Sequence, residues 1–124
     1  MKKYIALLFL IISFPSNAEE YICNYSWIGK KPSYSILIDV QGKKAITHGG
    51  VLSLEFTVAA NTSSELLIYM LFTKENSGPD YPVGFSTMAL DKKTKLFVYS
   101  NTFAGGNQNN HAIGKCEVVI RDGK

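Results

Sequence analysis

The two histidines of this 124-residue chain, together with two carboxylates in a predicted loop, are the side chains that could converge for metal binding or acid–base chemistry. His48 and His111 lie at predicted loops, and Glu75 and Asp80 lie in a further loop. Imidazole and carboxylate groups are common zinc ligands and common proton donors and acceptors. No His-x-His or His-x-x-x-His spacing is present, however. We therefore expect no metal site, no cofactor and no catalytic residue, and a protein that is not an enzyme.

The other reactive side chains are Cys23 and Cys116, the only cysteines, which lie near the two ends of the chain. Two cysteines in an exported protein usually pair. The alternative is a redox-active thiol, but the sequence has no Cys-x-x-Cys motif. We predict a disulfide between them, which would close a loop of roughly 93 residues and place the first and last strands side by side.

Residues 1–18 have the composition of a secretory signal peptide. Two lysines precede an apolar run over 4–14, and Ser16 and Ala18 supply the small residues that a signal peptidase reads. The apolar run is too short to span a bilayer, and no cysteine follows for lipid attachment. We expect cleavage after Ala18 and export of one domain, 19–124, to the periplasm or the medium of a bacterium.

The charge of the exported domain excludes two classes of partner. Without the two leader lysines, eleven Lys and Arg oppose ten Asp and Glu, so the net charge is about +1. Nucleic-acid binding needs a clustered basic surface, and so does binding to an anionic membrane. We therefore expect neither nucleic acid nor a membrane anchor as a partner.

The domain has the pattern of short strands, because apolar residues recur with a period of two between turn residues. The predicted strands are 20–27, 33–40, 44–48, 51–59, 65–74, 83–90, 95–102 and 114–121. This all-β pattern predicts a small antiparallel eight-stranded up-and-down barrel, lipocalin-like in outline, or a sandwich. A disulfide between the first and last strands favours the barrel, which also removes the sheet edges.

The fifth strand departs from simple alternation, because Leu66–Phe72 is apolar on both faces. A strand with a wet outer face should alternate. Either a loop or a second layer covers the strand, or Leu67, Tyr69 and Leu71 form an exposed surface. In the second case they would bind a partner or pair two copies as a homodimer.

In an up-and-down barrel, the longer connections all lie at one rim. They are 28–32, 48–50, 75–82 and 103–112, whereas the other rim holds only compact polar turns. Long loops on a rigid barrel usually carry binding. We expect the contacts to come from Asp80, Tyr81, Asn107, Asn109 and His111.

Aromatic residues at strand spacing permit a second function. The set is Tyr21, Tyr25, Trp27, Tyr34, Phe56, Phe85, Phe97 and Tyr99. These rings could fill the core, which would leave binding to the rim. They could instead line a cavity, and the protein would then carry an apolar small molecule inside the barrel.

The segment Ser77-Gly78-Pro79-Asp80-Tyr81 resembles in spacing the Ser-Gly-Ala-basic-Tyr segment of small periplasmic inhibitors of C-type lysozyme. Those inhibitors are also exported β-barrels with a cysteine near each end, so the resemblance implies an inhibitory loop here. Asp80 stands where that family has a cation, and an acidic target site would repel it. The leading prediction is a small exported binding or inhibitor-type protein that contacts a protein or saccharide, without assignment to this family.

Overall fold

Eight strands form one closed barrel in the computed structural model, which describes residues 19–29, 32–78, 80, 82–104 and 109–119. The strands are β1 (Glu19–Trp27), β2 (Ser33–Gln41), β3 (Lys44–Gly49), β4 (Leu52–Asn61), β5 (Glu65–Phe72), β6 (Gly84–Asp91), β7 (Leu96–Phe103) and β8 (Asn110–Val118). Each strand pairs antiparallel with the next, and β8 pairs with β1. The predicted all-β class is confirmed, and the barrel is the architecture formed.

The core is built from every second residue of the strands, because successive side chains of a strand point to opposite faces. The largest fully buried side chains include Phe56 and Phe97, which share the core with Ile38, Leu66 and Ile68. Leu66 and Phe97, and also the buried Val40 and Leu90, each lie one residue from a strand end, and these four strand ends share one rim. Side chains therefore fill that half of the barrel, as is usual for eight strands.

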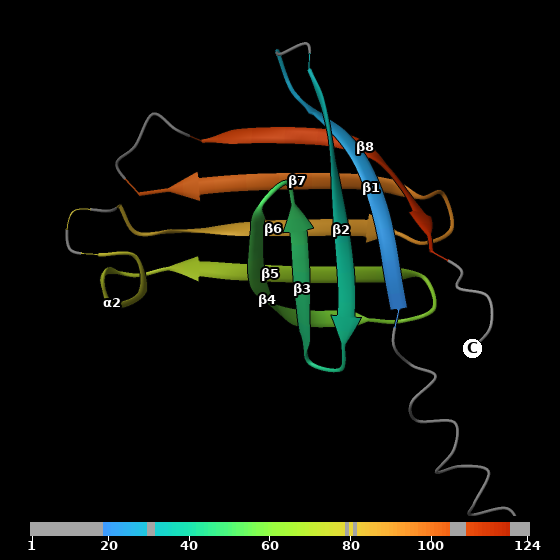
Figure 1. The fold of residues 1–124 in the computed structure, drawn as a ribbon, viewed down its shortest axis with the longest axis horizontal. Helices are drawn as coiled ribbons and strands as arrows, with labels where there is room; N and C mark the ends of the chain where they lie inside the picture. The colour runs from blue at the N-terminus through green and yellow to red at the C-terminus, as the bar shows by residue number, and fades with distance from the viewer. Residues whose placement is uncertain (1–18, 30–31, 79, 81, 105–108, 120–124) are drawn as a thin grey trace, which may run out of the picture.

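A bulge in β4 accompanies the change of strand direction around the barrel. The register of β4 with β5 shifts between Val58 and Ala60. An extra residue of this kind bends a strand and increases its twist. In Figure 1, β5, β6 and β7 run crosswise to β1 and β2, and β4 curves from one direction to the other.

The barrel closes where β8 meets β1. Cys23 and Cys116 are direct partners in this ladder, their Cα atoms are 3.9 Å apart, and a disulfide joins them. Both residues are buried in the core. The predicted disulfide is confirmed, and so is the neighbouring position of the first and last strands.

The strand boundaries differ from the sequence prediction by up to four residues, and two of the differences lie at the ends of β5 and β8 that border the longer connections. β8 begins at Asn110 rather than Gly114, because β7 continues along it and Asn101 pairs with Asn110. β5 ends at Phe72, and a four-residue helix, α2 (Lys74–Ser77), follows. Within the described ranges no helix has both the length and the apolar character to cross a membrane.

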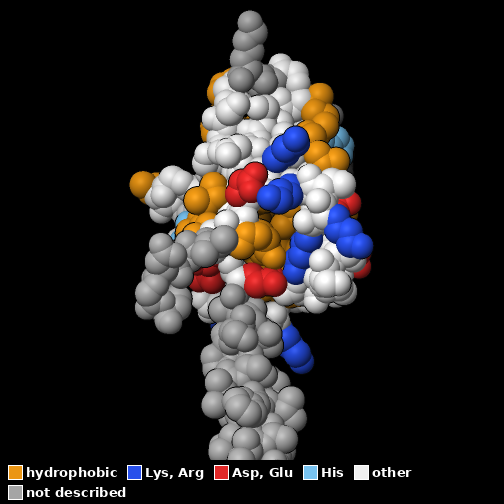
Figure 2. Space-filling model, turned by 90° about the vertical axis from the view of Figure 1, so that its right-hand side faces the viewer, with side chains coloured by type: hydrophobic (Ala, Val, Ile, Leu, Met, Phe, Trp, Pro, Cys, Tyr) orange, Lys and Arg blue, Asp and Glu red, His pale blue; other side chains and the backbone are white. Residues whose placement is uncertain are grey.

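Antiparallel order sorts the connections into two rims. The long-loop rim holds the connections that follow β1, β3, β5 and β7, as predicted, and the short-turn rim holds those that follow β2, β4 and β6. Figure 2 views the side on which the β4–β5 and β6–β7 turns lie, and lysine and acidic side chains lie next to one another there. The short-turn rim is therefore a charged surface.

One lysine of the short-turn rim has a structural role. The Nζ atom of Lys92 lies 3.3 Å from Glu19 Oε1 and 2.6 Å from Asn61 Oδ1. The hydroxyl of Tyr21 donates a hydrogen bond of 3.0 Å to the same Glu19 oxygen. This network ties the β6–β7 turn and the end of β4 to the start of β1.

We predict that replacing both Cys23 and Cys116 with Ala lowers the free energy of unfolding by about 4 kcal/mol, because a loop of 93 residues is no longer closed in the unfolded chain. The far-ultraviolet circular dichroism of the folded protein should still be that of a β-sheet, since the eight ladders remain. Urea unfolding of the wild type and the variant measures the difference. An equal free energy of unfolding for both would contradict a stabilising role of the bond.

Candidate functional site

The structure places only part of the predicted contact set at the long-loop rim. Asp80 is exposed in the turn after α2, and Glu75 is exposed in α2 itself. Tyr81 and Asn107 lie outside the described residues. Asp80 therefore stays a candidate contact, while the predictions for Tyr81 and Asn107 are untested.

Asn109 and His111 have roles that the sequence analysis did not anticipate. The side-chain oxygen of Asn109 accepts a hydrogen bond of 2.7 Å from the backbone N–H of Phe103, so it shapes the β7–β8 connection. The predicted loop position of His111 is wrong, because His111 lies within β8. Its Nδ1 atom is 2.9 Å from Ser100 Oγ on the neighbouring strand.

The two histidines do not converge. His48 pairs with Leu37, Leu37 with Ile22, and Ile22 with Glu117 of β8. His111 is six residues before Glu117 on that strand, a separation of about 20 Å at the usual rise per residue. In the described part of the chain, no group of three or more His, Cys, Asp or Glu residues is arranged to hold a metal ion.

Four aromatic residues lie together where the barrel opens at the long-loop rim, and we call them the mouth cluster: Tyr25, Trp27, Tyr34 and Tyr99. The ring centroids of Trp27 and Tyr99 are 5.0 Å apart, and Tyr25 lies 5.6–5.9 Å from each of the other three. Tyr34 is exposed, and the others are half-buried. Mutual packing therefore fixes these rings while part of each remains accessible.

Small residues on β8 let the rings of β1 and β7 meet. Ala112 pairs with Trp27 on one side and Tyr99 on the other. Gly114 likewise pairs with Tyr25 on one side and Phe97 on the other, and the ring centroids of these two residues are 6.0 Å apart. Because β8 offers no bulky side chain at these positions, aromatic rings from the flanking strands pack across it.

A small residue also lets two aromatic rings pack across a strand on the other side of the mouth. Gly84 of β6 pairs with Phe72 of β5 and Phe103 of β7. The Phe72 and Phe103 ring centroids are 5.2 Å apart. A Cβ atom at Gly84 would lie 2.2 Å from the Thr102 carbonyl oxygen, so only glycine fits without movement of β7.

A polar strip separates the two aromatic groups, and we call it the amide strip: Ser86, Asn101 and Asn110. Ser86 Oγ donates to Asn101 Oδ1, and Asn101 Nδ2 donates to Asn110 Oδ1 at 3.2 Å. Alternation along each strand places these side chains on the inner face, with Ser86 buried and Asn110 exposed. The mouth therefore offers amide groups beside aromatic rings, a lining that is typical of binding sites.

Burial keeps the mouth phenols protonated. Desolvation, with a smaller contribution from Tyr25, raises the pKa of Tyr99 to about 12. Desolvation also raises the pKa of Tyr25, and Tyr34 adds to that effect. Both hydroxyls therefore keep their protons to a higher pH than an exposed tyrosine does.

Sequence reasoning found the aromatic residues but not their division between two faces. The prediction that Phe85 belongs with the inner aromatics is wrong, because the inner positions of β6 are Ser86, Met88 and Leu90 and Phe85 is 43% exposed. Asn101 is not among the predicted site residues. Its signal was alternation, since it falls between Tyr99 and Phe103 on the inner face of β7.

Comparison with known proteins does not identify the chain. No protein-family model matches it, and no match is found among curated proteins or among solved structures. The segment with the spacing of the lysozyme inhibitors has no support from a family match. In it, Ser77 ends α2 and Gly78 follows with φ of 102°, whereas Pro79 and Tyr81 lie outside the described residues.

We predict that Gly114→Ala is costly, because the added Cβ would lie 1.9 Å from the carbonyl oxygen of Asn24. Relief of such overlap costs about 1–3 kcal/mol. Gly49→Ala is the matched control, since its Cβ would lie 3.7 Å from the nearest atom of Ile36. Urea unfolding measures both, and equal stability would contradict the close approach of β8 to β1.

We predict that stability falls between pH 10 and 12 and that Tyr99→Phe reduces the fall. The unfolded phenol loses its proton near pH 10, while the folded one holds it to about pH 12. The unfolded state therefore binds fewer protons in this window, and stability decreases as pH rises. Urea unfolding at pH 9 and pH 11 tests this, and an identical loss in both proteins would show that Tyr99 titrates normally.

Proposed function

We propose that this protein is a non-enzymatic binding protein that acts outside the cytoplasm and holds a protein partner at the long-loop rim. The mouth cluster and the amide strip form the centre of the binding surface. The observation that carries the proposal is that these rings are fixed against one another at 5.0–5.9 Å and yet remain partly accessible. The disulfide is compatible with an oxidising compartment.

Ring packing lowers the cost of binding. An ordered side chain that is already held in place loses little conformational freedom when a partner docks. Tyrosine and tryptophan are also the residue types most enriched at the energetic centres of protein interfaces. A packed aromatic group at a rim is thus suited to anchor a partner.

Apolar side chains around the mouth favour a protein as the partner. Ile28 and Leu52 are 63% and 64% exposed, and Val51 at the tip of the β3–β4 hairpin is wholly exposed. These side chains would be desolvated against an apolar surface of a partner. With a net charge of about +1, attraction must come from shape and apolar contact rather than from long-range steering.

The carrier function has less support. Phe56, Phe97 and their neighbours fill the half of the barrel below the mouth cluster. A carried ligand needs several hundred cubic ångströms of apolar space. The mouth is therefore better suited to contact a partner than to enclose one.

We predict that Tyr34→Ala weakens partner capture at least tenfold and that Ile22→Ala does not. The two side chains are similarly exposed, 46% and 43%, but only Tyr34 belongs to the mouth cluster. The measurement is quantitative capture of partner from the envelope and medium of the source cells on immobilised protein. Equal loss with both variants, or loss with Ile22→Ala alone, would place the binding surface elsewhere.

Two lysines of the short-turn rim differ in their contacts, and only one of them can serve as a control. Lys92 is unsuitable, because its ammonium group belongs to the network with Glu19 and Asn61. Lys93 is exposed, and we expect Lys93→Ala to leave capture unchanged.

A further inference from the structure

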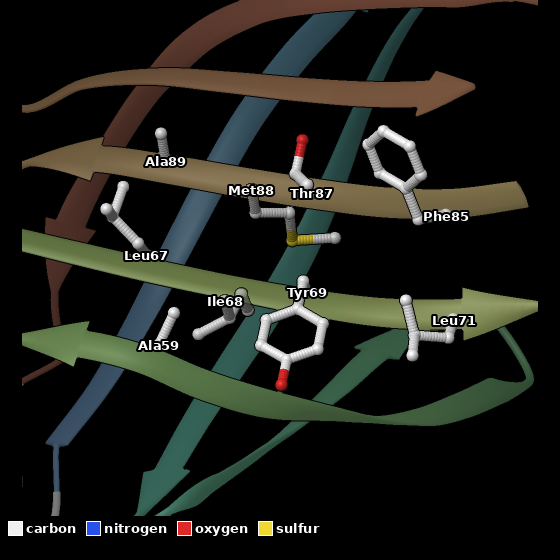
Figure 3. Close-up of a pocket in the computed structure, with 9 residues that line it drawn as sticks. All are labelled: Ala59, Leu67, Ile68, Tyr69, Leu71, Phe85, Thr87, Met88 and Ala89. Carbon is white, nitrogen blue, oxygen red and sulfur yellow. The ribbon is translucent and has the colours of Figure 1, made fainter.

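The outer face of β5, β6, β7 and β8 carries an unusual arrangement of side chains. Strand pairing aligns them in rows across the sheet: Leu67, Ala89, Val98 and Ile113 in one, Tyr69, Thr87, Ser100 and His111 in the next, and Leu71, Phe85 and Thr102 in a third. Figure 3 shows the β5 and β6 members of these rows. The outer face of a barrel in water is normally polar, so this face calls for an explanation.

Leu67 and Leu71 of the predicted patch on the fifth strand are exposed and Tyr69 is half-buried, and the apolar surface extends beyond β5. Leu67 and Leu71 are 40% and 52% exposed, and Phe85, Val98 and Ile113 fall in nearly the same range, 43–54%. An open groove of about 450 Å³ runs between β5 and β6, with Ala59 at its edge. Its lining is almost wholly apolar.

The area of this face suits a pair of copies. A large side chain exposes roughly 200 Å² when free, so the five residues together present on the order of 450 Å². Two such faces would bury about 900 Å² from these residues alone, and Tyr69, Thr87 and Ala89 bring the total close to the ~1,200 Å² of a stable interface. The largest apolar patch of a typical monomer is of this size and is often functional.

Charged residues at the border of this face have opposite signs at its two corners, so the borders of two copies can be complementary. None of the side chains in the three rows is Asp, Glu, Lys or Arg. At the short-turn end, Glu65 of β5 pairs with Asp91 of β6, whereas Lys115 of β8 pairs with Leu96. One corner is therefore acidic, and at the opposite corner of the same end Lys115 adds a positive charge beside the ion pair of Lys95 and Glu117.

We propose that this face binds a second copy of the chain, related by a two-fold axis that runs along the strands. Rotation about such an axis places β5 over β8 of the partner and keeps the short-turn ends together. Glu65 and Asp91 then face the partner's Lys115, and the apolar rows cover one another. An axis across the strands would instead set the acidic corner over Leu71 and Phe85, which gives no charge compensation.

This arrangement has a consequence for binding at the mouth. Because the axis runs along the strands, both long-loop rims point to the same side of the dimer. Two mouths on one side can engage a partner with two copies of its epitope, and the effective concentration of the second site then strengthens binding. The dimer itself does not depend on what the mouth binds.

The test is sedimentation equilibrium of the exported, disulfide-bonded protein. The wild type should show reversible dimerisation at micromolar concentration. Leu67→Lys should raise the dimer dissociation constant at least 100-fold while the circular dichroism stays unchanged. A wild type that remains monomeric at about 1 mM would overturn the proposal, and this is also the result expected if the groove binds only a small apolar molecule. A Leu67→Lys variant that still dimerises like the wild type would overturn it as well.

A charge exchange tests the direction of the axis. Lys115→Glu and Glu65→Lys should each weaken the dimer about tenfold, because like charges then face each other. Both changes in one chain should restore it, since the pair is re-formed with its signs reversed. Lys43→Glu, in the β2–β3 turn, is the control and should have no effect, because Lys43 is exposed and lies outside β5–β8. A double variant that is as weak as the single ones would contradict the proposed axis.

Discussion

The closure of β8 against β1 is the interaction on which the rest of this structure depends. Cys23 and Cys116 face each other in that ladder and are joined covalently. Two residues earlier on β8, Gly114 brings the backbones so close that a Cβ atom would strike Asn24. This close approach lets aromatic rings of β1 and β7 pack across β8. Closure also fixes the grouping of connections at two rims, so both the position and the shape of the mouth follow from it.

The closed barrel has three surfaces of different chemical character: the short-turn rim, the mouth and the outer face of β5–β8. The short-turn rim is charged, and its ion pair between Lys92 and Glu19 ties separate strands together. The mouth combines packed rings with amide groups. The outer face of β5–β8 is apolar, which is a liability for a chain that stays single, because exposed apolar surface favours association. Binding at the mouth and pairing through the outer face would use the two mainly uncharged surfaces, and most of the short-turn rim would remain in water.

Much of the fold could be predicted from the sequence, because alternation of apolar residues, turn residues and two terminal cysteines are local signals. The start of β8 could not be predicted from the sequence. Asn110 and His111 have low strand propensity and follow a Gly- and Asn-rich segment, but pairing with β7 overrides propensity. The candidate site could be predicted only in outline. The grouping of the long connections at one rim follows from the parity of the strands, whereas the side chains that line that rim depend on which face each strand turns inward. Asn101 and Phe85 could be assigned only from the register.

The central claim is that closure of β1 on β8 brings the mouth rings together, and nuclear Overhauser contacts in solution test it most directly. Trp27 is the only tryptophan, so its indole signals can be assigned without ambiguity. With ring centroids 5.0 Å apart, protons of Trp27 should show strong contacts to the ring of Tyr99, and weaker ones to Tyr25. The absence of any contact between Trp27 and Tyr99 in the folded, oxidised protein would contradict the account.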